Sequence, residues 1–141
     1  MSVRFHTDLD HHVLCARFIG AVSGPEGLNR LRAHHEAHPV GLNYNQIFDM
    51  RSWAGYLADQ DLVEHFRWVR TFRQSNGLEM PTLPINVYLA TRNVGASAIV
   101  KQLGDLRGQP IQWASSVAEA WELCAPGTSV PASVVKFFKA W

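Results

Sequence analysis

An apolar run that passes directly into a helical repeat constrains the fold of this chain most. Residues 84–90, Pro-Ile-Asn-Val-Tyr-Leu-Ala, are rich in β-branched and aromatic side chains, which predicts a buried strand. After Thr91, Arg92 and Asn93, apolar side chains recur at helical spacing through residues 96–106. A strand that leads into a helix is half of a βαβ unit. Because ligands of open α/β sheets bind beyond the carboxyl ends of such strands, we expect Thr91, Arg92 and Asn93 at the functional edge.

The rest of the chain alternates between segments with strand character and segments with helical character. Besides the strand at 84–90, strands are expected at residues 3–7, 12–18, 44–49 and 111–114, and helices at residues 23–38, 59–76, 94–106 and 118–124. The first two strands are separated by a short polar turn of hairpin length. This order predicts an α/β fold with a single mixed, mainly parallel sheet, an N-terminal hairpin and flanking helices.

Three of the helices carry start signals in the sequence. Ser23 and Ser116 are each followed three residues later by a glutamate, which is the spacing of a capping box. The long helix begins instead with Asp59 and Asp61, whose negative charges suit the positive end of a helix dipole.

Length and composition indicate one folded domain. A chain of 141 residues with 47% hydrophobic residues is large enough to bury a core of its own. We expect residues 1–125 to form the α/β domain, and residues 126–141 to form a loop and an apolar helix. Five of the last eight residues are large and apolar, so this tail is expected to pack on the domain or on a dimer partner, and a homodimer is expected.

Charge and hydropathy argue against several classes of protein. A formal net charge of +1 provides no broad attraction to nucleic acid. No run reaches the roughly 18 apolar residues of a membrane span, and the first residues lack the apolar core of a signal peptide, so a cytoplasmic protein is expected. Cys15 and Cys124 lie in apolar segments and are expected to be buried free thiols. His34 and His38 lie one helical turn apart, but two ligands rarely suffice for a metal site, so neither metal nor cofactor is expected.

Two parts of the sequence resemble a known family. The apolar strand at 45–49 before a long helix, and the ending at 111–121 with its Ser-x-x-Glu-Ala-Trp helix, resemble the SpoIIAA-like family of the STAS superfamily. The resemblance covers about residues 3–124 and implies a small module that binds a partner or a ligand, not an enzyme. Anti-sigma factor antagonists of this family carry a phosphorylatable serine where the helix after the third strand begins. Residues 58–62, Ala-Asp-Gln-Asp-Leu, contain no serine, which argues against that switch here.

The candidate binding residues fall into three groups. Asp49, Arg51 and Ser52 follow the third strand and should share an edge with residues 91–93. Trp53 and Tyr56 come next, in a connecting segment where aromatic side chains can line a pocket or a contact. The third group is a series of arginines on the long helix, Arg67, Arg70 and Arg73, whose spacing predicts a basic stripe that is either solvated or faces an acidic partner.

Three functions remain open from the sequence. The leading hypothesis is a non-enzymatic, possibly regulatory STAS-like module that binds a protein partner through the strand-end edge and the long helix. The alternative is a binder of an apolar or lipid-like small ligand, with a pocket of several hundred cubic ångströms between the sheet and the long helix. A small enzyme at the edge from Asp49 to Arg92 is the second alternative, although no catalytic residue is identified because no base or nucleophile stands out.

Overall fold

The computed structural model describes residues 2–90 and 110–139. Its strands are β1 (Ser2–Asp8), β2 (Val13–Ile19), β3 (Asn45–Asp49), β4 (Asn86–Leu89) and β5 (Ile111–Ala114). Its helices are α1 (Gly24–Ala37), α2 (Asp59–Ser75), α4 (Val117–Cys124) and α5 (Ala132–Lys139), with a 3-10 helix, η1 (Pro39–Asn43), after α1. The helix expected at 94–106 lies outside the described residues, as do Thr91, Arg92, Asn93 and Trp141.

The strands form one mixed sheet in the order β1-β2-β3-β4-β5. β1 and β2 are antiparallel, and the three pairings from β2 to β5 are parallel. The predicted fold class is therefore confirmed, including the N-terminal hairpin. Parallel strands place their carboxyl ends at the same edge, so the segment after β3 lies beside the ends of β2 and β4.

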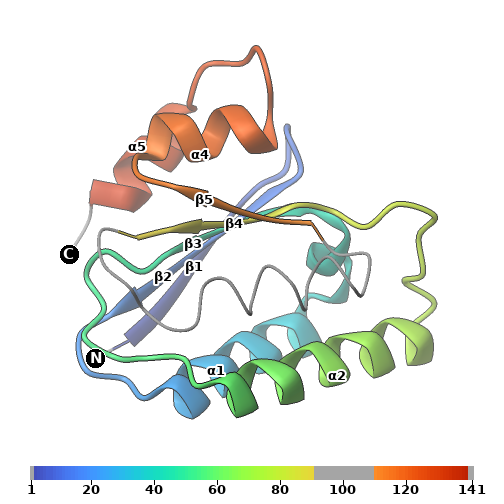
Figure 1. Ribbon diagram of the computed structural model, residues 1–141. Helices are drawn as coiled ribbons and strands as arrows, with labels where there is room; N and C mark the ends of the chain where they lie inside the picture. Colours follow the sequence, from blue (N-terminus) through green and yellow to red (C-terminus); the bar gives the residue numbers. More distant parts are fainter. Residues whose placement is uncertain (1, 91–109, 140–141) are drawn as a thin grey trace.

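Helices cover both faces of the sheet (Figure 1). α1 and α2 lie on one face, and α4 and α5 lie on the other. Side chains of β2 alternate between the two faces of the sheet. Ala16 and Phe18 belong to the core under α1 and α2, whereas Val13 and Cys15 belong to the core under α4 and α5. A strand with both faces covered reads as a nearly continuous apolar run, as β2 does.

The predicted helix starts are confirmed by their hydrogen bonds. The Ser23 hydroxyl accepts from the backbone N–H of Glu26 at 3.2 Å, and the Ser116 hydroxyl accepts from that of Glu119 at 3.1 Å. In α2 the Asp61 carboxylate accepts from the backbone N–H of Ala58 at 3.3 Å. Each contact satisfies a donor that has no partner within its own helix, which fixes where the helix begins.

The C-terminal helix α5 packs against its own domain. Val134 and Phe138 are 0% and 5% exposed and share a core cluster with residues of β2, β3, β4 and α4. Cys15 and Cys124 lie in the same cluster as buried free thiols, as expected, and burial raises the pKa of Cys124 to about 12. Within the described part of the chain, no helix has both the length and the hydropathy needed to cross a bilayer.

Candidate functional site

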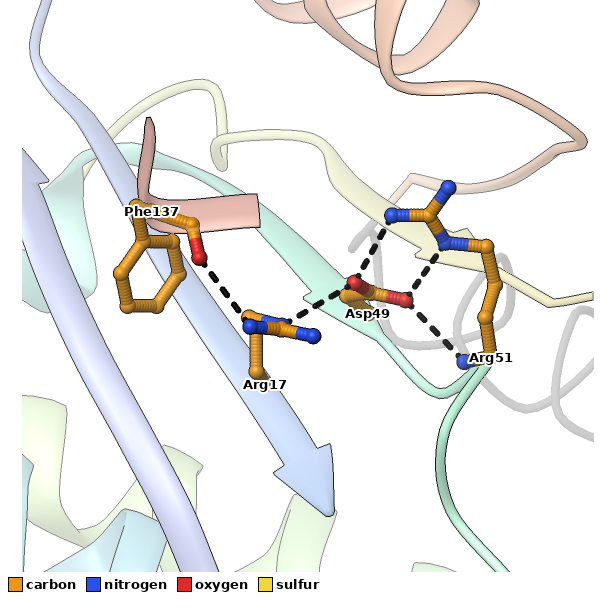
Figure 2. Close-up of polar contacts among 4 residues, drawn as sticks. All are labelled: Arg17, Asp49, Arg51 and Phe137. Atoms are coloured by element: carbon orange, nitrogen blue, oxygen red, sulfur yellow. Dashed lines mark hydrogen bonds and ion pairs between the residues drawn. The ribbon is translucent and has the colours of Figure 1, made fainter. Parts of the chain in front are cut away.

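A buried carboxylate between two arginines lies at the carboxyl-end edge of the sheet (Figure 2). Asp49 ends β3 and is 2% exposed. Its Oδ1 accepts from the backbone N–H and the Nε of Arg51, both at 3.0 Å, and its Oδ2 accepts from Arg51 Nη2 at 3.1 Å. Arg17 Nε lies 3.4 Å from the same Oδ2. Two guanidinium groups therefore compensate the charge of this carboxylate, which burial alone would make costly.

The partner on β2 links this site to the C-terminal helix. Arg17 stands beside Asp49 in the register of β2 and β3 and is 4% exposed. Its Nη1 donates to the backbone carbonyl of Phe137 in α5 at 3.1 Å. The cluster thus joins β2, β3 and α5, and it holds Arg51, whose side chain is 30% exposed, in one orientation at the surface.

The segment after Arg51 is tied to the end of β2. The backbone N–H of Gly20 donates to the Ser52 carbonyl at 2.9 Å, and the N–H of Ala54 donates to the Gly20 carbonyl at 2.8 Å. Ser52 is half-buried, so it offers only part of its surface to a partner. These bonds hold residues 52–54 in a fixed position at the end of β2.

Trp53 is buried and Tyr56 is exposed, a difference that the sequence did not reveal. Trp53 is 2% exposed, its indole N–H donates to the Val22 carbonyl at 2.7 Å, and its ring packs edge-on against Phe18. This side chain is therefore an anchor within the core. Tyr56 is 57% exposed and is available for contact.

Two of the three arginines predicted to form a basic stripe on α2 lie at the surface, and the third is buried. Arg67 and Arg70 are exposed, but Arg73 is 5% exposed and donates to the Leu42 carbonyl, the Asn43 side chain and the Leu78 carbonyl. A spacing of three residues falls short of the 3.6-residue helical turn, so each step rotates the side chain further around the helix. After two such steps the series has reached the buried side, where Arg73 joins α2 to η1.

Two hollows bear on the ligand hypothesis. Between the sheet and helices α1 and α2, the described residues line a cavity of only about 20 Å³, which is the room of one water molecule. An open hollow of about 460 Å³ lies instead along the second half of α2, lined by Phe66, Val69, Arg70, Met80 and Leu83 among others. The predicted space between sheet and long helix is therefore filled by side chains in the part of the molecule that is described.

Two buried histidines, His35 on α1 and His65 on α2, were not recognised from the sequence. His35 is 1% exposed and His65 is 8% exposed, and each imidazole lies 6.4 Å from the Trp68 ring. Burial lowers the pKa of both to about 3, and neighbouring positive groups add to the shift. His65 lies at core spacing between Leu62 and Val69, which is the signal that could have identified it. Among the described residues, no group of three or more histidine, cysteine, aspartate or glutamate side chains could hold a metal ion.

Comparisons with known proteins identify the fold. No family model matches the chain, and no curated protein matches its sequence. An uncharacterized protein of the DUF3478 family from Shewanella loihica PV-4, described as having a SpoIIAA-like fold, superposes with a TM-score of 0.53 at 9% identity, over 87% of this chain and 92% of that one. The anti-sigma factor antagonist SpoIIAA in its unphosphorylated form superposes with a TM-score of 0.50 at 9% identity, over 86% of this chain and 96% of that one. The chain has a SpoIIAA-like fold.

With this fold, the expected SpoIIAA-like architecture is confirmed. The helix that follows β3 is α2, and its first turn carries Asp59 and Asp61. The SpoIIAA-like fold of this chain therefore presents two carboxylates where the family resemblance places a serine.

Proposed function

We propose that this SpoIIAA-like chain is a non-enzymatic, cytoplasmic module that works by binding a protein partner. The proposed contacts form two patches. The strand-end patch consists of Arg51, Ser52 and Tyr56, and the helix patch consists of Arg67 and Arg70 on α2.

The observation that carries this proposal is the fixed guanidinium of Arg51. Its Nε and Nη2 are held by Asp49, and Asp49 is held in turn by the buried Arg17, so the side chain loses little conformational freedom when a partner binds. Arginine and tyrosine dominate protein interfaces, and Tyr56 stands exposed in the segment that follows. SpoIIAA, which shares this fold, is an anti-sigma factor antagonist, and this supports a regulatory role for this chain as well.

The same cluster argues against catalysis at this edge. Both carboxylate oxygens of Asp49 are occupied by guanidinium or backbone donors, so this group is not poised to take up a substrate proton. Its geometry is that of a support for Arg51.

The helix patch makes the proposal testable with matched charge changes. The chain is purified with a tag from its own cells in three forms: wild type, Arg67→Glu/Arg70→Glu, and Lys136→Glu/Lys139→Glu. The last variant makes the same change of charge at exposed positions of α5, on the opposite helical layer. We expect a co-purifying protein that wild type and the α5 variant retain and the α2 variant loses. Equal recovery with all three forms, or loss with both variants, would contradict a specific helix patch.

The second candidate function is the binding of an apolar small molecule with an anionic end. The observation that favours it is the 460 Å³ hollow, in which the Phe66, Val69 and Met80 side chains line a space beside the Arg70 guanidinium. Calorimetric titration with decanoate tests it, comparing wild type with Met80→Lys, a change at a partly exposed side chain of this hollow. Saturable binding that the variant loses supports this function, whereas a titration that shows only the heat of dilution would rule it out.

A further inference from the structure

Three buried polar side chains line one small cavity between the sheet and the helices α1 and α2. His35 comes from α1, His65 from α2 and Asn86 from β4, where Asn86 is 4% exposed. The cavity that they share has a volume of about 20 Å³. We propose that this cavity binds one water molecule, which joins the two imidazoles to the side-chain oxygen of Asn86.

Each of these side chains has a polar atom without a hydrogen-bond partner among the described residues. The atoms are Nδ1 of His35, Nδ1 of His65 and Oδ1 of Asn86. Such an atom destabilises the folded state, because the hydrogen bond that it makes to water in the unfolded chain is not replaced. Buried polar atoms are therefore nearly always paired, and ordered water is their partner where protein groups supply none. Three such side chains around one cavity point to a bound water.

The register of the sheet explains why a polar side chain faces this cavity. Gln46 of β3 stands beside Asn86 of β4, and Phe48 stands beside Tyr88 two residues further along. Phe48 and Tyr88 belong to the core under α1 and α2, so by alternation Gln46 and Asn86 lie on the same face. Gln46 is held by Gly41, because its Nε2 donates to the Gly41 carbonyl at 3.2 Å. Asn86 is left to form its hydrogen bond within the cavity.

The size and the lining of the cavity favour water over other occupants. A volume of about 20 Å³ has room for one water molecule and is far too small for an organic ligand. Its described lining contains no carboxylate and no cysteine, so a metal ion would find no negatively charged ligand there. Besides burial, which is the main cause, the Arg73 guanidinium helps to lower the pKa of His35, and the same positive charge would repel a cation.

The number of available protons determines how the hydrogen bonds are arranged. Both imidazoles are neutral at pH 7, because burial lowers the pKa of each to about 3, and a neutral imidazole carries one ring N–H. Water has two protons and can donate to only two of the three atoms. One histidine therefore donates from Nδ1 to the water oxygen, and the water donates to Nδ1 of the other histidine and to Oδ1 of Asn86. The water then makes three hydrogen bonds, the usual number for a buried water.

A crystal structure of the full chain that resolves ordered waters tests the site directly. We expect one density peak within about 3.2 Å of His35 Nδ1, His65 Nδ1 and Asn86 Oδ1. The proposal is overturned if the cavity holds no peak, if the peak contacts fewer than all three atoms, or if it carries the anomalous signal of a metal. The site shares no residue with the strand-end patch or the helix patch, so this result is independent of partner binding.

NMR of ¹⁵N-histidine-labelled wild type at pH 7 tests the proton arrangement. Ring ¹⁵N chemical shifts distinguish a proton on Nδ1 from a proton on Nε2, and His35→Gln and His65→Gln assign the two signals. We expect His35 and His65 to be fixed in opposite tautomers. Two identical tautomers would refute the proposed hydrogen bonds.

A double-mutant cycle tests whether the side chains share one partner. His65→Phe and Asn86→Leu each remove one contact with the water at similar side-chain volume. The double variant should shift the urea midpoint by clearly less than the sum of the two single shifts, because the second change removes an interaction that is already lost. Asn86→Leu combined with Thr128→Val is the matched control, since the Thr128 hydroxyl bonds Trp121 in the opposite layer, and these shifts should add. Additive shifts for the first pair would contradict a shared water, and the crystal and NMR tests use wild type if a variant fails to fold.

Discussion

Lowering the pH from 7 to 4.5 should destabilise this protein through His35 and His65. Both imidazoles are buried and neutral between α1 and α2, and burial lowers the pKa of each to about 3 from an ordinary value of 6.5. The surrounding charged groups reinforce this direction: His34 on α1 and Arg73 on α2 oppose protonation of His35, and Arg32 on α1 opposes that of His65.

Proton linkage gives the sign and the size of this effect on the free energy of unfolding. Because the folded-state pKa values are lowered, the unfolded chain binds more protons between about pH 3 and 6.5. The stability is therefore fully present above pH 6.5 and falls as the pH decreases toward 3. Each histidine shifts the free energy of unfolding by up to about 1.4 kcal/mol per pH unit in this window. Integrated from pH 7 to 4.5, the two together remove about 5 kcal/mol, a large share of the stability of a typical domain.

Urea denaturation at intervals between pH 4.5 and 7, followed by tryptophan fluorescence, measures how the free energy of unfolding depends on pH. His35→Gln/His65→Gln should flatten this dependence, although the variant is less stable at pH 7, while His38→Gln, at the exposed C-cap of α1, should keep it. A wild-type stability that is flat over this range, or a double variant with an unchanged slope, would refute the reasoning.

Further predictions concern the charge cluster and the local starts of helices. Asp49→Asn should cost about 3 kcal/mol, because it removes the compensating charge of the buried Arg17, whereas Arg51→Ala, at a partly exposed pair, should cost about 1 kcal/mol. The reverse order in guanidinium denaturation would contradict the burial argument. Ser23→Ala should lower the free energy of unfolding by about 1 kcal/mol through loss of the N-cap, and an unchanged midpoint would count against it. Gly24→Ala should cost about 2 kcal/mol, because its Cβ would lie 2.5 Å from the Tyr56 carbonyl oxygen; a melting temperature equal to wild type would show that the Tyr56 segment yields freely.

Local patterns in the sequence predicted the sheet and the helix starts well. Strand residues and capping residues act over a few positions, so Ser23 and Ser116 identify their helices without knowledge of the rest of the fold. The nearly continuous apolar run of β2 agrees with the helices that cover both faces of the sheet.

Side-chain roles that depend on distant partners were not accessible in this way. Arg73 continues the spacing of Arg67 and Arg70, yet it turns inward because the carbonyl of Leu42, thirty-one residues away, accepts its hydrogen bond. Trp53 lies in a connecting segment, yet the Val22 carbonyl and the Phe18 ring fix it in the core. The link from Asp49 through Arg17 to α5 crosses 120 residues between Arg17 and Phe137, so no local pattern announces it.

The most direct test of partner binding is native mass spectrometry of the chain isolated from its own cells, followed by denaturing mass spectrometry of whatever is released. The account predicts a complex that releases a second kind of polypeptide, and this complex should be absent for Arg67→Glu/Arg70→Glu. A retained apolar small molecule with no second polypeptide would contradict the central claim and establish the ligand-binding alternative.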